Sequence, residues 1–283
     1  MARRLHLMLF LLIHGVKTSD SLLAKFYLST RFGVAWWNRP PCLNGCCQKE
    51  SAKAELFYRK IVQLLLSVNA SPCVVDKKGA TPLHLAAWKG DPDVVGMLLA
   101  HDNPPVNIDQ QTENLETALL IAAQFGHVSV VAQLIARGAD VTLQNINQET
   151  PLDLAAQYGR LETVQHLLRV RPLLVQQYKF PNSRSRFSSS TPLHRASKNG
   201  HEKVVAVLLK AGFDPNILGL DGTPLHEAAC FGKASVVRLL LMKGADLNAI
   251  DSNGKTVEMI LADYPQDVPP TKNVMRVIRG LYC

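Results

Sequence analysis

TPLHEAACFGKASVVRLLLMKGADLN, residues 223–248, is the stretch of sequence from which the rest of the chain can be understood. Thr223 is a good N-cap residue, and Pro224 at the first helical position needs no N–H partner. Gly232 and Gly244 each predict the end of a short apolar helix, because glycine adopts the left-handed conformation without a Cβ clash. Neither helix can bury its apolar face alone, so the unit must stack on copies of itself.

Copies of this unit recur along the chain. The successive starts are Thr81, Thr117, Thr150, Thr191, Thr223 and Thr256. Subtraction gives spacings of 36, 33, 41, 32 and 33 residues. A period near 33 residues with the pattern T-P-L-H-x-A resembles the ankyrin-repeat family. The resemblance implies an all-α fold, an ankyrin-repeat solenoid of paired antiparallel helices with β-hairpin loops.

The repeats divide the chain into segments. We expect full repeats at 76–108, 109–144, 145–175, 191–217 and 218–250. The long spacing predicts an inserted loop at 176–190, which is polar and Ser-rich. Residues 51–75 are interpreted as a partial N-terminal capping repeat, in which Asn69 stands where Gly244 stands, and residues 251–283 as a C-terminal capping repeat with a polar outer face. Residues 1–50 form a divergent N-terminal segment, signal-like or disordered.

A closer resemblance rests on longer motifs, namely HLAAWKGD (84–91), ETALLIAAQFGH (116–127) and ETPLDLAAQYGRLETV (149–164). With these the array resembles that of the Odin-type adaptors, and Caskin-type scaffolds are the second match. Odin-type adaptors carry ankyrin repeats followed by SAM domains and a phosphotyrosine-binding domain, and the printed sequence ends before such domains. The resemblance implies a protein-binding scaffold or adaptor in intracellular signalling.

Motifs for catalysis or cofactor binding were sought and not found: the sequence has no G-x-x-x-x-G-K, G-x-G-x-x-G, G-x-S-x-G or H-E-x-x-H. We therefore expect no enzyme activity, no cofactor and no small-molecule substrate. His84, His194 and His226 recur at one repeat position. Successive repeats lie about 10 Å apart, too far to share a zinc ion, so these histidines are predicted to bond neighbouring hairpin loops. No metal site is expected.

The concave face of such an array is the predicted protein-binding surface. Its candidate residues precede TPLH or follow the two alanines of the first helix. They are Lys77, Lys78, Trp88, Lys89, Gln124, Phe125, Gln157, Tyr158, Lys198, Asn199 and Phe231. Aromatic side chains dominate binding hot spots, so Phe125, Tyr158 and Phe231 could anchor a partner. The equal alternative is that these three rings pack against adjacent repeats.

A basic patch between 169 and 210 carries a second hypothesis. Its members are Arg169, Arg171, Lys179, Arg184, Arg186, Arg195 and Lys203. Such a patch could contact an anionic membrane or nucleic acid, and nucleic acid is the weaker option because interleaved aromatic residues are few. Ser185 and Ser188 follow arginines in a pattern that basophilic kinases accept, so phosphorylation could cancel part of this charge. The alternative is an inert insertion.

The expected location is the cytoplasm. The chain has a net charge of +8 and six cysteines without a disulfide pattern, which indicates a reducing compartment. No internal run reaches the roughly 18 apolar residues of a membrane span. Residues 1–13, MARRLHLMLFLLI, have the basic start and short apolar run of a signal peptide, but no clear cleavage site follows. If residues 1–15 do act as a signal peptide, the secretory pathway is the alternative.

Overall fold

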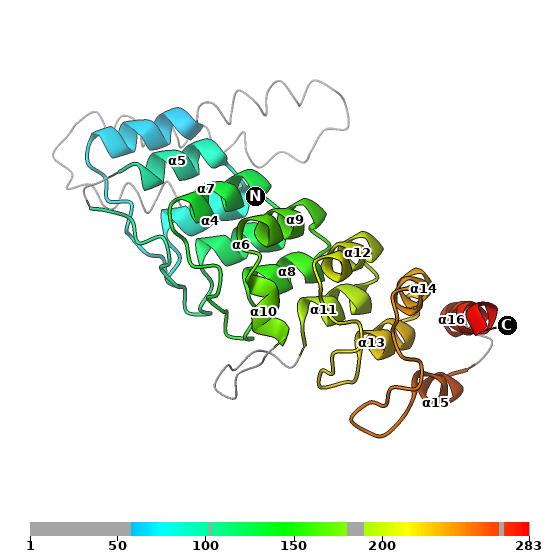
Figure 1. Ribbon diagram of the computed structural model, residues 1–283. Helices are drawn as coiled ribbons and strands as arrows, with labels where there is room; N and C mark the ends of the chain where they lie inside the picture. Colours follow the sequence, from blue (N-terminus) through cyan, green and yellow to red (C-terminus); the bar gives the residue numbers. More distant parts are fainter. Residues whose placement is uncertain (1–57, 102–103, 180–189, 266–268, 283) are drawn as a thin grey trace, which may run out of the picture. The chain divides into compact units, whose positions relative to one another are not determined.

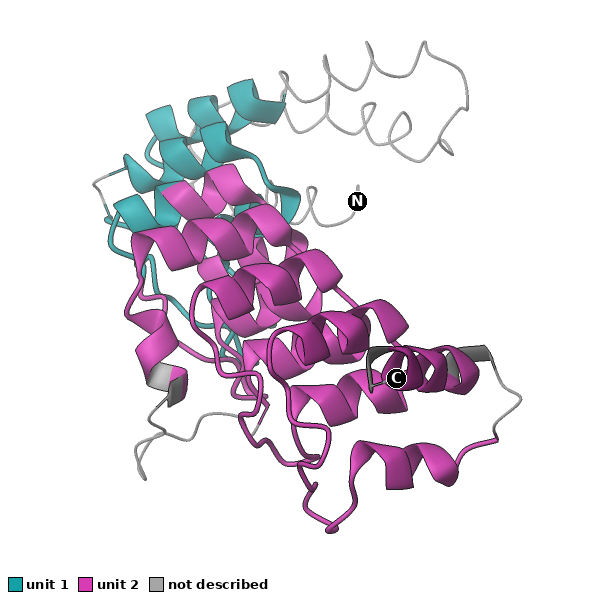
Figure 2. Ribbon diagram, turned by 45° about the vertical axis from the view of Figure 1, so that its right-hand side comes forward, with its two compact units in different colours: residues 1–118, 133–139 teal, residues 119–132, 140–283 magenta. Residues whose placement is uncertain are grey.

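A computed structural model describes residues 58–101, 104–179, 190–265 and 269–282 (Figure 1). The chain divides into two compact units (Figure 2). Unit 1 comprises residues 1–118 and 133–139, and unit 2 comprises residues 119–132 and 140–283. The boundaries between the units fall at helices α6 (Ala118–Phe125) and α7 (Val128–Ala136). Each unit is described by itself.

Unit 1 contains a helix at 58–67, followed by α4 (Pro82–Lys89) and α5 (Pro92–Leu99). Its core is made of apolar side chains that are fully or almost fully buried, among them Val62, Leu83, Val94 and Leu98. The helix at 58–67 lies in the segment for which the sequence predicts a partial repeat. Asn69 has a φ of 58°, so it adopts the left-handed conformation that its alignment with a glycine predicts.

Unit 2 is built from two rows of packed helices. The first row consists of α8 (Pro151–Gln157), α11 (Pro192–Asn199), α13 (Pro224–Cys230) and α15 (Val257–Ala262). The second row consists of α9 (Leu161–Val170), α12 (Glu202–Lys210), α14 (Ala234–Met242) and α16 (Pro269–Tyr282). Each first-row helix from α8 to α13 packs on the second-row helix that follows it in the chain. The predicted pairing of antiparallel helices is therefore confirmed.

The start and end of the first-row helices follow from the sequence. At the start of α8, the Thr150 hydroxyl accepts a hydrogen bond from the Asp153 N–H, and Pro151 fills the first helical position. At its end Gly159 has a φ of 67°, and a Cβ there would lie 2.5 Å from the His201 ring. Only glycine fits because both the backbone angle and the approach of the next repeat exclude a side chain.

The loop before each first helix, here called the finger turn, closes on itself. In the turns at 76–80, 145–149 and 251–255, the first residue donates its N–H to the carbonyl oxygen of the fifth. The side chains of Asp76, Asn145 and Asp251 accept two backbone N–H bonds each within these turns. The described residues contain no β-strand but include an isolated antiparallel bridge between Gly219 and Gly222. The predicted hairpin loops are thus too short to form strand ladders.

The predicted inserted loop at 176–190 is wrong at its beginning. Residues 174–179 form helix α10 (Leu174–Lys179), and Leu174, Val175 and Tyr178 are buried. Burial of these three side chains on one helix face, together with two hydrogen bonds of the Tyr178 hydroxyl, explains why the segment folds. Residues 180–189 lie outside the described part of the chain.

Candidate protein-binding surface

In three repeats a histidine fastens the first helix to the next finger turn. The Thr81 N–H donates to His84 Nδ1 at 3.1 Å, so Nε2 carries the proton and donates to the Glu116 carbonyl oxygen at 3.0 Å. The Nε2 atoms of His194 and His226 lie 3.1 Å and 3.2 Å from the carbonyl oxygens of the next finger turns. Burial lowers the pKa of His194 to about 4, which keeps its ring neutral. The predicted structural role of these histidines is confirmed.

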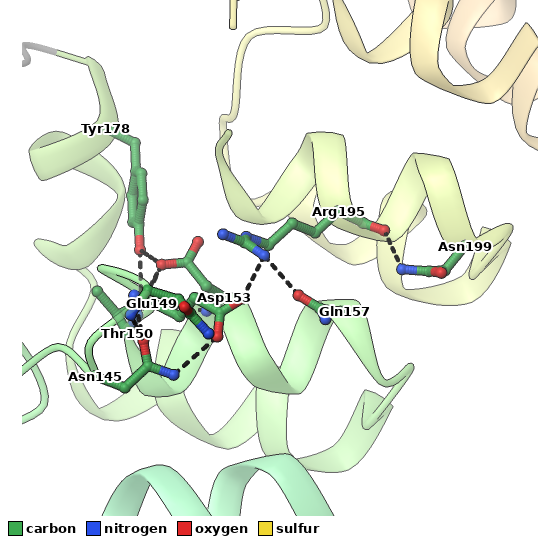
Figure 3. A network of polar contacts seen from close by, with 9 residues as sticks. Asn145, Glu149, Thr150, Asp153, Gln157, Tyr178, Arg195 and Asn199 are labelled. Atoms are coloured by element: carbon green, nitrogen blue, oxygen red, sulfur yellow. Dashed lines mark hydrogen bonds and ion pairs between the residues drawn. The ribbon is translucent and has the colours of Figure 1, made fainter. Parts of the chain in front are cut away.

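The third repeat has Asp153 at the histidine position, and α10 supplies its partner (Figure 3). Asp153 Oδ2 accepts hydrogen bonds from the Thr150 N–H at 2.9 Å, the Thr150 hydroxyl at 2.7 Å and the Tyr178 hydroxyl at 3.2 Å. Burial is the main cause that raises the pKa of Asp153 to about 6. Burial also raises the pKa of Tyr178. The residue at the histidine position therefore bonds the Tyr178 hydroxyl of α10 in this repeat, where the histidines of the other repeats bond a finger-turn carbonyl oxygen.

Arg195 ties α11 back to the third repeat and does not belong to an exposed basic patch. Its Nη1 lies 2.6 Å from Glu149 Oε1 and 2.6 Å from Gln157 Oε1, and only 15% of its side chain is exposed. Glu149 Oε2 in turn accepts a hydrogen bond from Asn145 Nδ2 at 2.8 Å (Figure 3). The charge of Arg195 is thus matched by a nearly buried carboxylate, and its assignment to the patch is corrected.

Phe125, Tyr158 and Phe231 form an aromatic row at the ends of first helices in unit 2. Each residue directly precedes a glycine with positive φ, and their exposed fractions are 39%, 43% and 50%. Half-exposed rings leave area for a partner while keeping contact with their own repeats. The sequence left two alternatives open, anchoring a partner and packing against adjacent repeats, and half-exposed rings are compatible with both. Lys198 Nζ lies 4.7 Å from the centroid of the Phe231 ring, within cation–π range.

The first helices and finger turns also enclose a pocket of about 300 Å³ in unit 2. Its lining residues are Gln157, Ser190, His194, Arg195, Lys198, Asn199, Leu220, Asp221 and Glu227. The pocket contains both ion-paired residues and an apolar wall from Leu220, of which 66% is exposed. Pockets that combine apolar walls with a few polar groups are usual binding sites.

The remaining predicted binding residues fall into different environments. Lys77 and Lys78 are exposed on the first finger turn, Trp88 and Gln124 are half-buried, and Asn199 is exposed. Lys89 does not contribute an exposed surface. Its Nζ lies 4.4 Å from the centroid of the Tyr58 ring and 3.8 Å from Asp91 Oδ2, with 9% of the side chain exposed. Within unit 1, the Tyr58 ring and the Asp91 carboxylate both attract the Lys89 ammonium group, which keeps this side chain from being exposed.

The predicted basic patch lies only partly within the described residues. Arg169, Arg171 and Lys203 are exposed on or beside α9 and α12. The side chain of Lys179 lies outside the described residues. So do Arg184 and Arg186, and also the candidate phosphorylation sites Ser185 and Ser188. Without Arg195, the patch reduces to three described cations.

Several functional candidates were missed by sequence reasoning. Ile146, Leu218 and Leu220 are exposed on the finger-turn side, and Asp221 is exposed beside them. The signal that could have found them is an apolar residue inside a turn of Asn, Asp and Gly, where folding alone does not require it. Exposed apolar residues next to an aromatic row are typical of a protein-binding surface.

Among the described residues, no group of three or more His, Cys, Asp and Glu side chains is arranged to hold a metal ion. No helix in the described ranges has the length and apolar character needed to cross a membrane.

The fold and this surface define a class of protein, the helix-pair repeat proteins. Family models described as ankyrin repeats match residues 66–122, 103–176 and 170–251. Since one of these models alone matches more than half of the chain, the chain belongs to the ankyrin-repeat family.

Curated relatives share part of the array. The chain is 30% identical over 158 residues to the nuclear factor NF-kappa-B p105 subunit of Gallus gallus, which is 56% of this chain and 16% of that protein. It is 31% identical over 159 residues to the B-cell lymphoma 3 protein homolog of Mus musculus, which is 56% of this chain and 34% of that protein. The aligned regions thus span about a third or less of these relatives. The two give no support to the narrower resemblance to Odin-type or Caskin-type adaptors.

Solved structures agree on the fold. The crystal structure of the ankyrin repeat domain of Bcl-3, a unique member of the IkappaB protein family, has a TM-score of 0.58 at 23% identity. The alignment covers 79% of this chain and 92% of that chain. The human ASB11 ankyrin repeat domain has a TM-score of 0.53 at 22% identity, covering 70% of this chain and 98% of that chain. At this level of identity the likeness supports the fold.

Proposed function

We propose that the chain is a non-catalytic interaction module that binds a protein partner through the first helices and finger turns of unit 2. This is the surface that the sequence predicts to be concave. The observation that carries the proposal is the half-exposed aromatic row of Phe125, Tyr158 and Phe231. Ankyrin repeats typically mediate protein–protein interaction, and membership of this family supports the proposal. The cytoplasm is the proposed location, and a role as a signalling scaffold is part of the same hypothesis.

The aromatic row favours a protein partner over other ligands. Aromatic side chains supply large contact areas at low entropic cost, and three of them repeat at the spacing of the helices. The exposed Ile146 and Leu218 extend the apolar area toward the finger turns. A surface with these residues buries apolar area only when a partner covers it, which stabilises the complex.

The test is affinity capture with the full chain and two variants of equal fold. The binding variant replaces Phe125, Tyr158 and Phe231 with serine, and the matched control replaces the exposed Arg169 and Lys203 with serine. We expect that a protein retained by the natural chain is lost by the aromatic variant and kept by the control. Circular dichroism verifies that both variants are folded. Retention of the same proteins by all forms would contradict the proposal.

Contact of the basic patch with anionic lipid is a weaker alternative. Its predicted member Arg195 is paired with Glu149, which leaves the described cations Arg169, Arg171 and Lys203. Each cation near an anionic membrane contributes about 1 kcal/mol, so these three described cations would contribute about 3 kcal/mol together. The Arg169 and Lys203 variant above serves as its test, since vesicle binding should be lost in that variant alone.

A further inference from the structure

The aromatic row of unit 2 has a gap at the fourth repeat. Phe125, Tyr158 and Phe231 directly precede the glycines that end their helices, and the corresponding residue before Gly200 is Asn199. The Asn199 side chain turns back to its own helix, because Nδ2 donates to the Arg195 carbonyl oxygen at 3.0 Å (Figure 3). The pocket of about 300 Å³ includes this position. A partner side chain could therefore enter where the neighbouring repeats carry their own rings.

This pocket, here called the Asn199 pocket, has one apolar wall and one polar wall. Leu220 on the finger turn supplies an exposed apolar wall. Gln157, Asn199 and Glu227 supply amide and carboxylate groups on the helix side. A side chain that fills it must therefore combine a long apolar stem with a polar end.

The charges around the pocket determine which polar end group a bound side chain can carry. Arg195 is paired with Glu149 at 2.6 Å, and Lys198 Nζ lies 3.7 Å from Glu227 Oε2. Asp221 is exposed and forms no ion pair with any other described residue. Two cations therefore stand against three carboxylates, and the excess charge is negative. An anionic side chain would be repelled, whereas a cation would complete the balance.

We propose that the Asn199 pocket receives an arginine side chain of a protein partner. The proposal rests on the proposed function and names the chemistry of the partner at one point. The stem of the arginine lies against Leu220, and its guanidinium donates to the Asp221 carboxylate. Arginine fits better than lysine because its planar fork can donate to a carboxylate and to an amide oxygen together, and because it is less strongly hydrated.

The first experiment uses small probes and the full chain. N-acetyl-argininamide is titrated while the side-chain amide signals of Asn199 and Gln157 are followed by NMR. N-acetyl-lysinamide and N-acetyl-tyrosinamide are the comparison probes. We expect the arginine probe to shift both signals with a dissociation constant on the order of 1–10 mM, the range for a ligand of this size in an open pocket. The lysine and tyrosine probes should bind more weakly.

Two variants and one matched control locate the binding. Asn199→Phe fills the pocket with the residue type that Phe125 and Phe231 show to be compatible with this position, and Asp221→Asn removes the uncompensated charge. Each should weaken the arginine probe about tenfold or more, as expected for loss of a charge-assisted hydrogen bond or of the space itself. As the matched control, Glu202→Gln removes an exposed carboxylate of α12 that does not line the pocket, and it should keep binding within about twofold.

The outcomes separate this inference from the proposed function. Tighter binding of the tyrosine probe, equal binding of lysine and arginine, or unchanged binding in Asp221→Asn would overturn the arginine pocket. In that case the aromatic variant could still lose its captured partner, and the proposed function would stand. If the aromatic variant loses nothing but the arginine probe binds as expected, the proposed function fails while the pocket remains.

Discussion

Asp153 should make the stability of this protein depend on pH in a direction opposite to that of most carboxylates. Burial raises its pKa from an ordinary 3.8 to about 6. A difference of this size means that ionisation of Asp153 costs the folded state about 3 kcal/mol more than the unfolded chain. Because the folded state holds the proton more tightly, this contribution is fully present below about pH 4 and is lost as the pH rises through 6.

Asp153→Asn isolates this effect. The asparagine carbonyl can accept the bonds that Thr150 and Tyr178 donate to Oδ2. Its amide would take the place of Oδ1, a buried oxygen without a hydrogen-bond partner among the described residues. An unsatisfied buried donor costs about 1–3 kcal/mol. The variant should therefore be less stable than the natural protein at pH 4 and about equally stable at pH 7.5.

The assay is urea unfolding of both proteins between pH 4 and 8, followed by circular dichroism. Other titrating groups cancel when the two free energies of unfolding are subtracted at each pH. The free energy of unfolding of Asp153→Asn minus that of the natural protein should rise by about 3 kcal/mol between pH 4 and pH 8. Glu162→Gln, which removes an exposed carboxylate from α9, controls for the change in net charge. A difference that stays constant with pH would refute the reasoning, because it would mean that Asp153 does not titrate as a buried acid.

Three further predictions concern stability. Tyr178→Phe removes the hydroxyl that donates to Asp153, so the free energy of unfolding should fall by about 1–3 kcal/mol and amide exchange in α10 should become faster, as hydrogen-exchange mass spectrometry would detect. Leu225→Ala deletes a fully buried side chain and should lower the free energy of unfolding in urea by roughly 2–5 kcal/mol. The control Leu220→Ala removes an exposed side chain and should change this free energy by less than about 0.5 kcal/mol. Equal losses in the two variants would contradict the assigned repeat core. Arg195→Met leaves the nearly buried Glu149 carboxylate without its cation and should lower the free energy of unfolding by about 3–5 kcal/mol. Adding Glu149→Leu should restore most of this loss. A double variant that is no more stable than Arg195→Met would argue against the ion pair.

Most of the fold could be predicted because it depends on local signals that repeat. Thr-Pro occurs at four of the six starts, and a glycine follows the first helix in most repeats. These signals and the apolar spacing between them can be recognised one unit at a time. The structural role of His84 and its equivalents was also predictable, because a neutral ring at this position can reach the next finger turn. Asn69 at a glycine position is a third case, confirmed by its φ of 58°.

The errors arose where a side chain acts across repeats. Arg195 is a cation in a basic stretch of sequence, and only the fold brings it beside Glu149. Lys89 is placed against Tyr58, a residue 31 positions earlier by subtraction, from a segment that does not follow the repeat pattern. The binding surface was predicted from repeat positions alone, so it contained the aromatic row and omitted the exposed finger-turn residues Leu218 and Leu220.

Helix α10 was missed although its signal is present. Leu174, Val175 and Tyr178 stand at i, i+1 and i+4, the spacing of one helix face, and they precede a Ser-rich stretch that dominated the interpretation. The number of residues beyond the usual period predicts an insertion, and the insertion of residues 180–189 stays a prediction. It could not say that the insertion begins by folding back on the third repeat.

The pair of Asp153 and Tyr178 constrains how this array can change over generations. An ordinary finger turn presents a carbonyl oxygen to the first helix of the preceding repeat, and the histidine of that helix donates a hydrogen bond to this oxygen. Asp153 has no proton to offer when ionised, so an ordinary turn in place of α10 would set two acceptors against each other. Shortening the insertion and restoring histidine would have to occur together, and either step alone would lower stability. We therefore expect the long spacing and the aspartate to occur together in related arrays.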